Sequence, residues 1–262
     1  MNSLKKNILE KNNIKILIIV RLSSSRLKNK AKLKINGLSL IEILILRLLK
    51  YFKSNQIIIC TSNKQNNIFF KNIIKLYKIN FYAGSDKNIF KRIIGCQKKF
   101  KFDHFARITG DNPLTDAPTL IKLAAKHIKN KSDFTFTQSI PNGMKPEIIS
   151  FKALKKASKL AFDKNSSEYL TYYFVRHTFN FFKIKIKKIH RSEHLVSVTI
   201  DYKKDFIKLK KILNQSIYLS REKIVNLLGK IKKYQNFQKE RIPVKTKKYD
   251  VRLKNGDQTI LL

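Results

Sequence analysis

The chain has 262 residues, 43% of them hydrophobic, which is enough for the core of one α/β domain. Its 57 Lys and Arg against 17 Asp and Glu give a net charge of +40, typical of proteins that bind nucleic acid or anionic membranes. The basic residues are mostly lysines spread along the whole chain beside abundant Ile and Asn, so we favour an A/T-rich codon bias over a dedicated polyanion site. Apolar stretches broken by Glu42 and Arg47 fall far short of the ~20 residues of a membrane helix.

The first half of the chain alternates apolar, β-branched runs with helical patterns. We expect strands at Ile14–Val20, Gln56–Cys60, Asn80–Tyr82 and His104–Ile108, and helices at Leu38–Phe52, Asn67–Tyr77 and Asp86–Lys98. Alternating strands and helices predict a mostly parallel sheet with helices on both faces. Ligands bind such sheets beyond the carboxyl ends of the strands, so motifs that directly follow a strand are the candidates for a site.

The second half is less regular. A turn signal at Pro141-Asn142-Gly143 precedes a short strand at Glu147–Ile149. We then expect helices at Lys152–Phe162, Ser167–His177 and Phe206–Leu213, a half-exposed strand at Phe181–Ile189 and a strand at Leu195–Ile200 that ends at Asp201. The tail from Pro243 has no periodicity and is expected to be mobile or to contact another subunit.

Two features bear on the compartment. The segment Met1–Lys15 is polar and lacks an apolar core, so we expect no secretory signal. Cys60 and Cys96 are isolated thiols without metal-site spacing, which indicates a reducing compartment. We therefore expect a cytoplasmic protein.

Thr109-Gly110-Asp111 follows the fourth predicted strand. A carboxylate at the tip of a buried parallel strand has little freedom and suits a Mg²⁺ ligand. Gly110 would let the backbone approach a nucleotide closely, and Asp116 can cap a helix that begins near Ala117. The alternative is a turn in which Asp111 is merely a cap.

The segment Arg21–Lys30 follows the first predicted strand. It combines the hydroxyls of Ser23, Ser24 and Ser25 with the cations of Arg21, Arg26, Lys28 and Lys30. Triphosphate oxygens need closely spaced donors of this kind. In so basic a chain the alternative is a solvated connection. A third segment, Ala83-Gly84-Ser85-Asp86, follows the third predicted strand and should reach the same edge of the sheet.

Taken together in this order, the segments resemble the cytidylyltransferase family that includes CMP-sialic acid and CMP-Kdo synthetases, and most of all its SpsF branch. The branch pattern Arg-x-Thr-Gly-Asp-x-Pro-Leu-x-Asp is matched in full by Arg107, Thr109, Gly110, Asp111, Pro113, Leu114 and Asp116. The branch loop Arg-Met-Gly-Ser-Ser-Arg-Leu-Pro-Gly-Lys is matched at Arg21, Ser24, Ser25, Arg26 and Lys30, whereas Ser23, Lys28 and Asn29 replace its Gly, Pro and Gly. Four further groups of residues occur in the same order as in that branch. They are Gly84, Ser85 and Asp86 with Arg92; Pro141–Gly143 with Glu147; Glu168 with Thr171; and Thr199-Ile200-Asp201.

The resemblance implies a Rossmann-like, GT-A-like nucleotidyltransferase domain over residues 14–215. A polar extension, 1–13, would precede it, and a helix and tail, 216–262, would follow it. Within the domain, a β-containing arm at about 138–190 would bind the sugar and form a homodimer.

The resemblance also implies a role for each matching residue. Arg21, Ser24, Ser25, Arg26 and Lys30 would hold the CTP phosphates, with Gly84, Ser85, Arg92, Thr109 and Gly110 near the nucleotide. Asp111 and Asp201 would hold Mg²⁺, with Arg21, Lys30 and Asp111 as the catalytic set, and Asn142, Gly143 and Glu147 would face the sugar. The alternatives are an ordinary helix cap for Asp201 and a salt bridge with a lysine for Glu147.

The implied reaction is transfer of CMP from CTP to a sugar acid with release of pyrophosphate, in the synthesis of surface polysaccharide or another glycan. No specific nucleic-acid partner and no membrane partner are expected. Two alternatives remain. One is a degenerate or differently specific sugar nucleotidyltransferase, and the other is a basic nucleic-acid-binding protein on the same scaffold.

Overall fold

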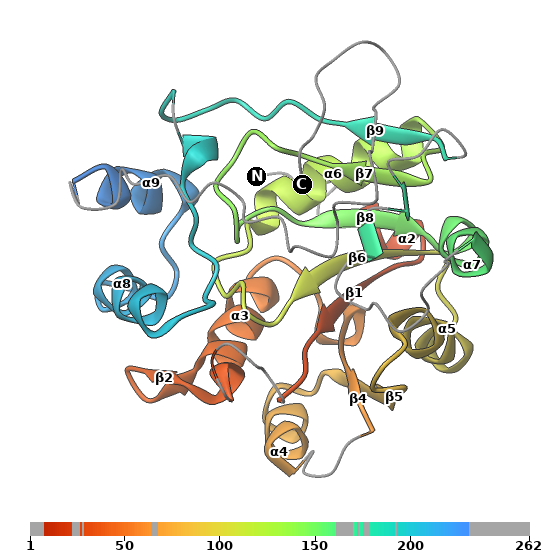
Figure 1. Cartoon of the computed structure of the whole chain (residues 1–262), viewed down its shortest axis with the longest axis horizontal. Helices are drawn as coiled ribbons and strands as arrows, with labels where there is room; N and C mark the ends of the chain where they lie inside the picture. The colour runs from red at the N-terminus through yellow and green to blue at the C-terminus, as the bar shows by residue number, and fades with distance from the viewer. Residues whose placement is uncertain are drawn as a thin grey trace.

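The computed structural model describes residues 8–22, 27, 29–63, 68–160, 170–171, 173–174, 179–191 and 193–230 (Figure 1). Within these residues the main sheet has the strand order β5-β4-β1-β6-β8-β7-β9. Its strands are β1 (Ile14–Ile19), β4 (Ile57–Ser62), β5 (Asn80–Gly84), β6 (His104–Thr109), β7 (Phe134–Phe136), β8 (Glu147–Ser150) and β9 (Phe181–Lys183). The predicted class, a mostly parallel α/β sheet covered by helices, is confirmed.

The parallel half of the sheet is wound in two directions. From β1 the chain passes through α3 (Leu40–Leu49) to β4, and through α4 (Ile68–Tyr77) to β5. It then returns through α5 (Ile89–Phe100) to β6, which lies on the other side of β1. The carboxyl ends of β1 and β6 therefore flank the switch point where α/β sheets bind ligands.

The other half of the sheet is mixed. β8 is antiparallel to both β6 and β7, while β9 is parallel to β7. The helices α6 (Ala117–Lys129) and α7 (Phe151–Leu160) cover this half on opposite faces. Because β8 runs against β6, its first residue, Glu147, lies toward the edge where β6 ends.

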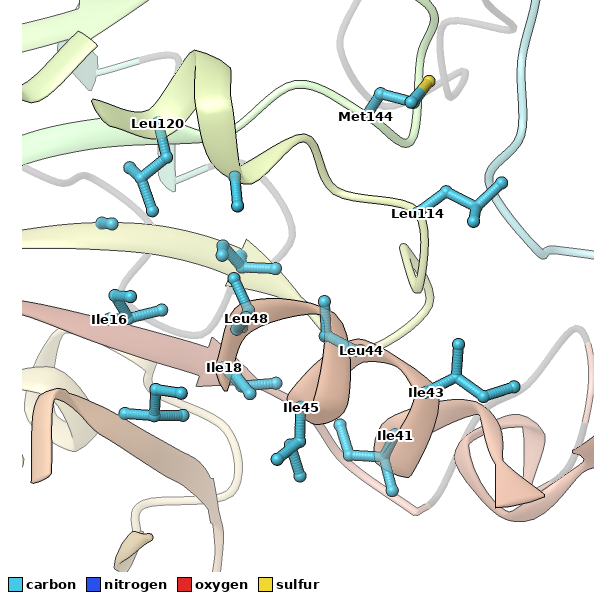
Figure 2. Packing of buried hydrophobic residues seen from close by; sticks show 14 of the residues in the cluster. Ile16, Ile18, Ile41, Ile43, Leu44, Ile45, Leu48, Leu114, Leu120 and Met144 are labelled. Atoms are coloured by element: carbon cyan, nitrogen blue, oxygen red, sulfur yellow. The ribbon is translucent and has the colours of Figure 1, made fainter. Parts of the chain in front are cut away.

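Alternation along the strands divides the core into two layers. Ile14, Ile16 and Ile18 of β1 face one side and Leu17 faces the other, and all are at most 1% exposed. Figure 2 shows Ile16 and Ile18 with Leu44 and Leu48 of α3 in the first layer. Each such side chain contributes roughly 1.5–3 kcal/mol when fully buried, so this layer is a major source of stability for the parallel half.

A short hairpin that the sequence analysis did not predict precedes α3. β2 (Lys34–Ile35) pairs with β3 (Leu38–Ser39) across Asn36-Gly37, whose φ values are 50° and 80°. Asn-Gly between apolar residues is the usual signal for such a turn. The helix predicted from Leu38 therefore begins at Leu40, where the Ser39 hydroxyl accepts from the Glu42 N–H and the Glu42 carboxylate accepts from the Ser39 N–H.

Two strand predictions in the second half need correction. β9 ends at Lys183 instead of Ile189, although Ile184 and Ile186 stay buried between exposed lysines. The predicted strand Leu195–Ile200 is wrong. Glu193–Leu195 is a 3₁₀ turn, and Ser197 makes an isolated bridge to Asn142. The predicted helix Ser167–His177 and the tail from Pro243 lie largely or wholly outside the described residues.

The two ends of the described chain pack onto the domain. Leu9 of the short helix α2 (Ile8–Lys11) is fully buried, although the surrounding sequence is polar. Beyond the sheet, α8 (Lys203–Leu213) and α9 (Arg221–Lys230) lie on the side toward which β6 points (Figure 1). Arg47 of α3 donates to the carbonyls of Ile217 and Leu219 at 2.7 and 3.0 Å, which attaches the connection between α8 and α9 to the domain.

In the part of the chain that the structure describes, no helix combines the length and apolar character needed to cross a membrane.

Candidate functional site

Lys30, Asp111 and Asp201 converge beyond the carboxyl ends of β1 and β6. Lys30 Nζ donates to Asp111 Oδ2 at 2.6 Å, to Asp201 Oδ1 at 3.3 Å and to the Ile200 carbonyl at 3.1 Å. The Ile200 N–H in turn donates to the Asp111 carbonyl at 3.2 Å. Three segments distant in the sequence therefore meet at the switch point. The approach of Lys30 to Asp111 agrees with the predicted convergence of the segments that follow β1 and β6, whereas Asp201 was expected here only from the resemblance.

Lys30 is positioned by a tight turn at the end of the segment 21–30. Asn29 has φ 53° and ψ 27°, and its carbonyl accepts from the Lys32 N–H at 2.8 Å. Asparagine tolerates this left-handed conformation better than other residues that carry a Cβ. Asn29 therefore stands at low conformational cost where the loop pattern that this segment resembles has glycine. Ser23, Ser24, Ser25, Arg26 and Lys28 lie outside the described residues, so their predicted contacts with phosphate stay predictions.

The Asp111 carboxylate is ionised in this setting. Burial alone would raise its pKa, but the charge and hydrogen bond of Lys30 outweigh burial and hold the pKa below its ordinary value. Oδ1 is buried and makes no hydrogen bond of ordinary geometry within the described chain, although the Thr109 hydroxyl also helps to lower the pKa. A buried anionic oxygen in this state is a suitable ligand for a cation.

The donor set fits Mg²⁺ in a nucleotide site. Mg²⁺ usually takes one or two protein carboxylates and completes its octahedron with phosphate oxygens and water. Asp111 and Asp201 would supply that number, and their side chains are 19% and 28% exposed. Within the described residues no cluster of three or more His, Cys, Asp or Glu side chains could hold a metal without further ligands.

Neither Asp201 nor Asp111 stands at the N-cap position of a helix: Tyr202 precedes α8 and Asp116 precedes α6. The Asp205 carboxylate accepts from the N–H groups of Asp201 and Tyr202 at the start of α8, at 3.1 and 2.8 Å. Asp116 caps α6 by accepting from the Thr119 N–H at 3.0 Å, as predicted. The Asp201 and Asp111 side chains instead contact Lys30.

Gly110 has a packing role at the tip of β6. A Cβ built on it would lie 2.6 Å from Val20 Cγ2, so the space that the glycine leaves is filled by the chain that follows β1. The Gly110 N–H also donates to the Ile19 carbonyl at 2.9 Å. The structure thus gives Gly110 a reason other than the predicted close approach of a nucleotide.

Arg92 holds the segment Gly84–Asp86 in place through hydrogen bonds to its backbone. Its side chain is 1% exposed, and it donates to the carbonyls of Ser85 and Asp86, both at 2.8 Å. Arg21 Nη1 approaches the same Asp86 carbonyl at 3.4 Å, which links the loop after β1 with the loop after β5. Arg92 therefore acts on the position of the predicted nucleotide loop, and its buried guanidinium presents little charge at the surface.

Two of the predicted sugar-facing residues, Asn142 and Gly143, are held in place largely by backbone contacts. Gly143 has φ 84°, and a Cβ there would lie 2.6 Å from the Thr199 nitrogen. The Asn142 N–H donates to the Val196 carbonyl at 2.9 Å, and the Asn142 carbonyl accepts from Val198 at 2.8 Å. The Asn142 amide oxygen also accepts from Lys145 Nζ. The turn 141–143 is thus joined to the segment that carries Asp201.

Glu147 forms an ion pair with an arginine instead of the lysine considered from the sequence. Its Oε2 lies 2.7 Å from Arg107 Nη1, and the paired residues stand opposite each other on β8 and β6. The side chains are 21% and 17% exposed. Sequence reasoning assigned no role to Arg107, although its place in the motif Arg107–Leu114 was a signal that could have found it.

Comparisons with known proteins identify the family of this chain. A family model described as cytidylyltransferase matches residues 15–224. SpsF of Bacillus subtilis, a spore coat polysaccharide biosynthesis protein, is 24% identical over 214 residues, which cover 78% of this chain and 88% of SpsF.

Solved structures show the same fold. A cytidylyltransferase of Leptospira borgpetersenii superposes with a TM-score of 0.76 at 22% identity, covering 88% of this chain and 99% of that one. A CMP:2-keto-3-deoxy-manno-octonic acid synthetase solved with CTP gives 0.60 at 12% identity, covering 78% of this chain and 99% of that one. The resemblance inferred from the motifs is confirmed.

Proposed function

The chain belongs to the cytidylyltransferase family, and we propose that it transfers CMP from CTP to a hydroxyl of a sugar acid, with release of pyrophosphate. The observation that carries the proposal is the meeting of Lys30, Asp111 and Asp201 at the switch point of the sheet. A cation and two carboxylates at this position are the groups that nucleotide phosphates and their metal require.

In the proposed reaction the acceptor hydroxyl attacks the α-phosphorus of CTP. A bond forms between the acceptor oxygen and phosphorus, the bond to the pyrophosphate oxygen breaks, and the hydroxyl proton is released. Lys30 and Arg21 would offset the charge that builds on the phosphates, while Asp111 and Asp201 would hold Mg²⁺. The chemistry that Mg²⁺ supplies when bound is charge neutralisation and a lower pKa for the attacking hydroxyl.

The acceptor would lie against Asn142 and Glu147, beside the segment that leads to Asp201. Support for a sugar acid comes from the resemblance to CMP-sialic acid and CMP-Kdo synthetases and from the fold shared with the keto-sugar-acid synthetase. For a 2-keto sugar acid the nucleophile is the anomeric hydroxyl. The name of the SpsF relative supports a place in polysaccharide synthesis, and we propose a cytoplasmic homodimer.

The test is pyrophosphate release from CTP with Mg²⁺ and a panel of sugar acids. Replacing Asp111 by Asn keeps its size but removes the anionic oxygens, so we expect the rate to fall at least 100-fold. The matched control is Asp103→Asn, which changes an exposed carboxylate just before the opposite end of β6 and should leave the rate within about twofold. An unchanged rate in Asp111→Asn would contradict the assignment.

Nucleotide choice needs a separate measurement, because a sugar nucleotidyltransferase of this fold can prefer another base. Thermal unfolding with Mg²⁺ and each of CTP, UTP, ATP and GTP should show selective stabilisation by CTP. A ligand that binds only the folded state at 100 times its Kd adds about 2.7 kcal/mol to the free energy of unfolding. Stronger stabilisation by another nucleotide would favour the differently specific alternative.

A further inference from the structure

The Lys30 ammonium occupies the position between the two carboxylates that would hold Mg²⁺. An ammonium has three N–H donors, and three acceptors surround this one: Asp111 Oδ2, Asp201 Oδ1 and the Ile200 carbonyl. The Lys30 side chain is only 13% exposed. All three donors of the ammonium are therefore directed at groups of this site, and two of them at the aspartates.

We propose that Lys30 is an internal counter-ion that keeps divalent metal out of the Asp111–Asp201 site until a nucleotide arrives. Triphosphate oxygens would replace the aspartates as acceptors for the ammonium, and the freed carboxylates would then accept the metal. Metal and nucleotide thus enter together. This inference rests on the proposed function and concerns how that same site is regulated.

Charge and distance both support the exclusion. The two aspartates have two formal negative charges, and the formal charge of Lys30 reduces the total for the group to −1. Mg²⁺ binds oxygens at 2.0–2.1 Å and needs direct access to them, whereas Asp111 Oδ2 already accepts a short, charge-assisted hydrogen bond of 2.6 Å. A metal arriving alone would have to displace this ammonium or lie beside it against repulsion.

The neighbouring lysines do not share this position. Lys32 Nζ lies 5.5 Å from the centre of the Phe69 ring, and Lys34 is exposed on β2. In the described part of the segment, Lys30 is the lysine that contacts the aspartates. Removing Lys30 and removing Lys34 therefore delete the same charge, but only the first change alters the contact.

The experiment measures binding of Mn²⁺ alone, since Mn²⁺ prefers the same oxygen ligands and its free form gives an electron paramagnetic resonance signal. We expect Lys30→Met to bind Mn²⁺ at least tenfold more tightly than the unaltered chain. The control Lys34→Met should stay within about twofold. Adding Asp111→Asn to Lys30→Met should abolish the gain, which locates the new affinity at this site.

Equal Mn²⁺ affinity in the unaltered chain and Lys30→Met would overturn the proposal, as would a similar gain in Lys34→Met. Circular dichroism checks that each variant is folded. If Lys30→Met does not fold, Lys30→Gln removes the charge while keeping a hydrogen-bond donor and decides the question in the same way.

Binding of labelled CTP is measured separately by equilibrium dialysis, with and without Mn²⁺. Absence of CTP binding defeats the proposed function, whereas the metal-alone comparison decides the role of Lys30.

Discussion

The proposed nucleotide side and the proposed acceptor side of the candidate site are built in different ways. On the nucleotide side, the charged side chains of Lys30, Asp111 and Asp201 contact one another. On the acceptor side, the turn at Gly143 is joined to the segment before Asp201 mainly by backbone contacts. On the first side, a side-chain substitution should therefore change activity with little effect on stability. On the second side, a substitution that disturbs the backbone should change activity and stability together.

The strongest test of this contrast is Gly143→Ala. The new Cβ would meet the Thr199 nitrogen at 2.6 Å in a residue with φ 84°, so we expect a loss of about 3 kcal/mol in the free energy of unfolding. The control Gly37→Ala has a similar φ of 80° but meets nothing within 4 Å, and should cost about 1–2 kcal/mol. Urea unfolding measures both, and equal losses would show that the contact with Thr199 is unimportant.

An effect of intermediate size on stability is expected at the opposite end of β6, far from the candidate site. His127 is fully buried, and its Nε2 and Nδ1 contact His104 at 3.0 Å and Thr135 at 2.8 Å. Burial, followed by the nearby His104 charge, lowers the pKa of His127 to about 3.

The unfolded chain, with an ordinary histidine pKa near 6.5, then binds protons that the folded chain does not. Stability should fall by about 2 kcal/mol for this histidine between pH 7.5 and pH 5. Urea unfolding at the two pH values measures the loss, and His127→Gln should remove this part of it. An identical pH dependence in the variant would contradict the assignment.

The smallest effect is expected from Glu147→Gln. The change removes the charge that faces Arg107 Nη1 at 2.7 Å, in a pair that is partly exposed, and should cost about 1 kcal/mol of stability. If Glu147 serves the acceptor, the KM for the sugar should rise about tenfold while the KM for CTP stays within twofold. A rise in the KM for CTP instead would place Glu147 on the nucleotide side.

The parallel half of the sheet could be predicted from the sequence because its signals are local. Runs such as Ile14–Val20 and the helical spacing within Leu38–Phe52 contain the information needed to form each element. The segment Leu195–Ile200 was misjudged because an apolar run can equally be an extended loop. Its main partners, Asn142 and Asp111, lie far away in the sequence.

The approach of Lys30 to Asp111 could be predicted from the sequence for a related reason. Motifs after consecutive strands must meet at one edge of a parallel sheet, so the meeting of Lys30 with Asp111 followed from topology. The position of the ammonium between two carboxylates, and the pairing of Arg107 with Glu147, depend on side-chain packing and strand register. Neither contact can be deduced from the spacing of residues in the sequence.

The fork of Arg92 has a consequence for how lysine-rich sequences of this kind evolve. A guanidinium can donate to two carbonyls through two different nitrogens, as Arg92 does through Nε to Ser85 and through Nη2 to Asp86. A lysine cannot reproduce that planar pair of donors. Mutational drift from arginine to lysine is therefore opposed at such positions. Among the many lysines of this chain, Arg92 is therefore expected to persist, because it holds the turn that follows β5 in place.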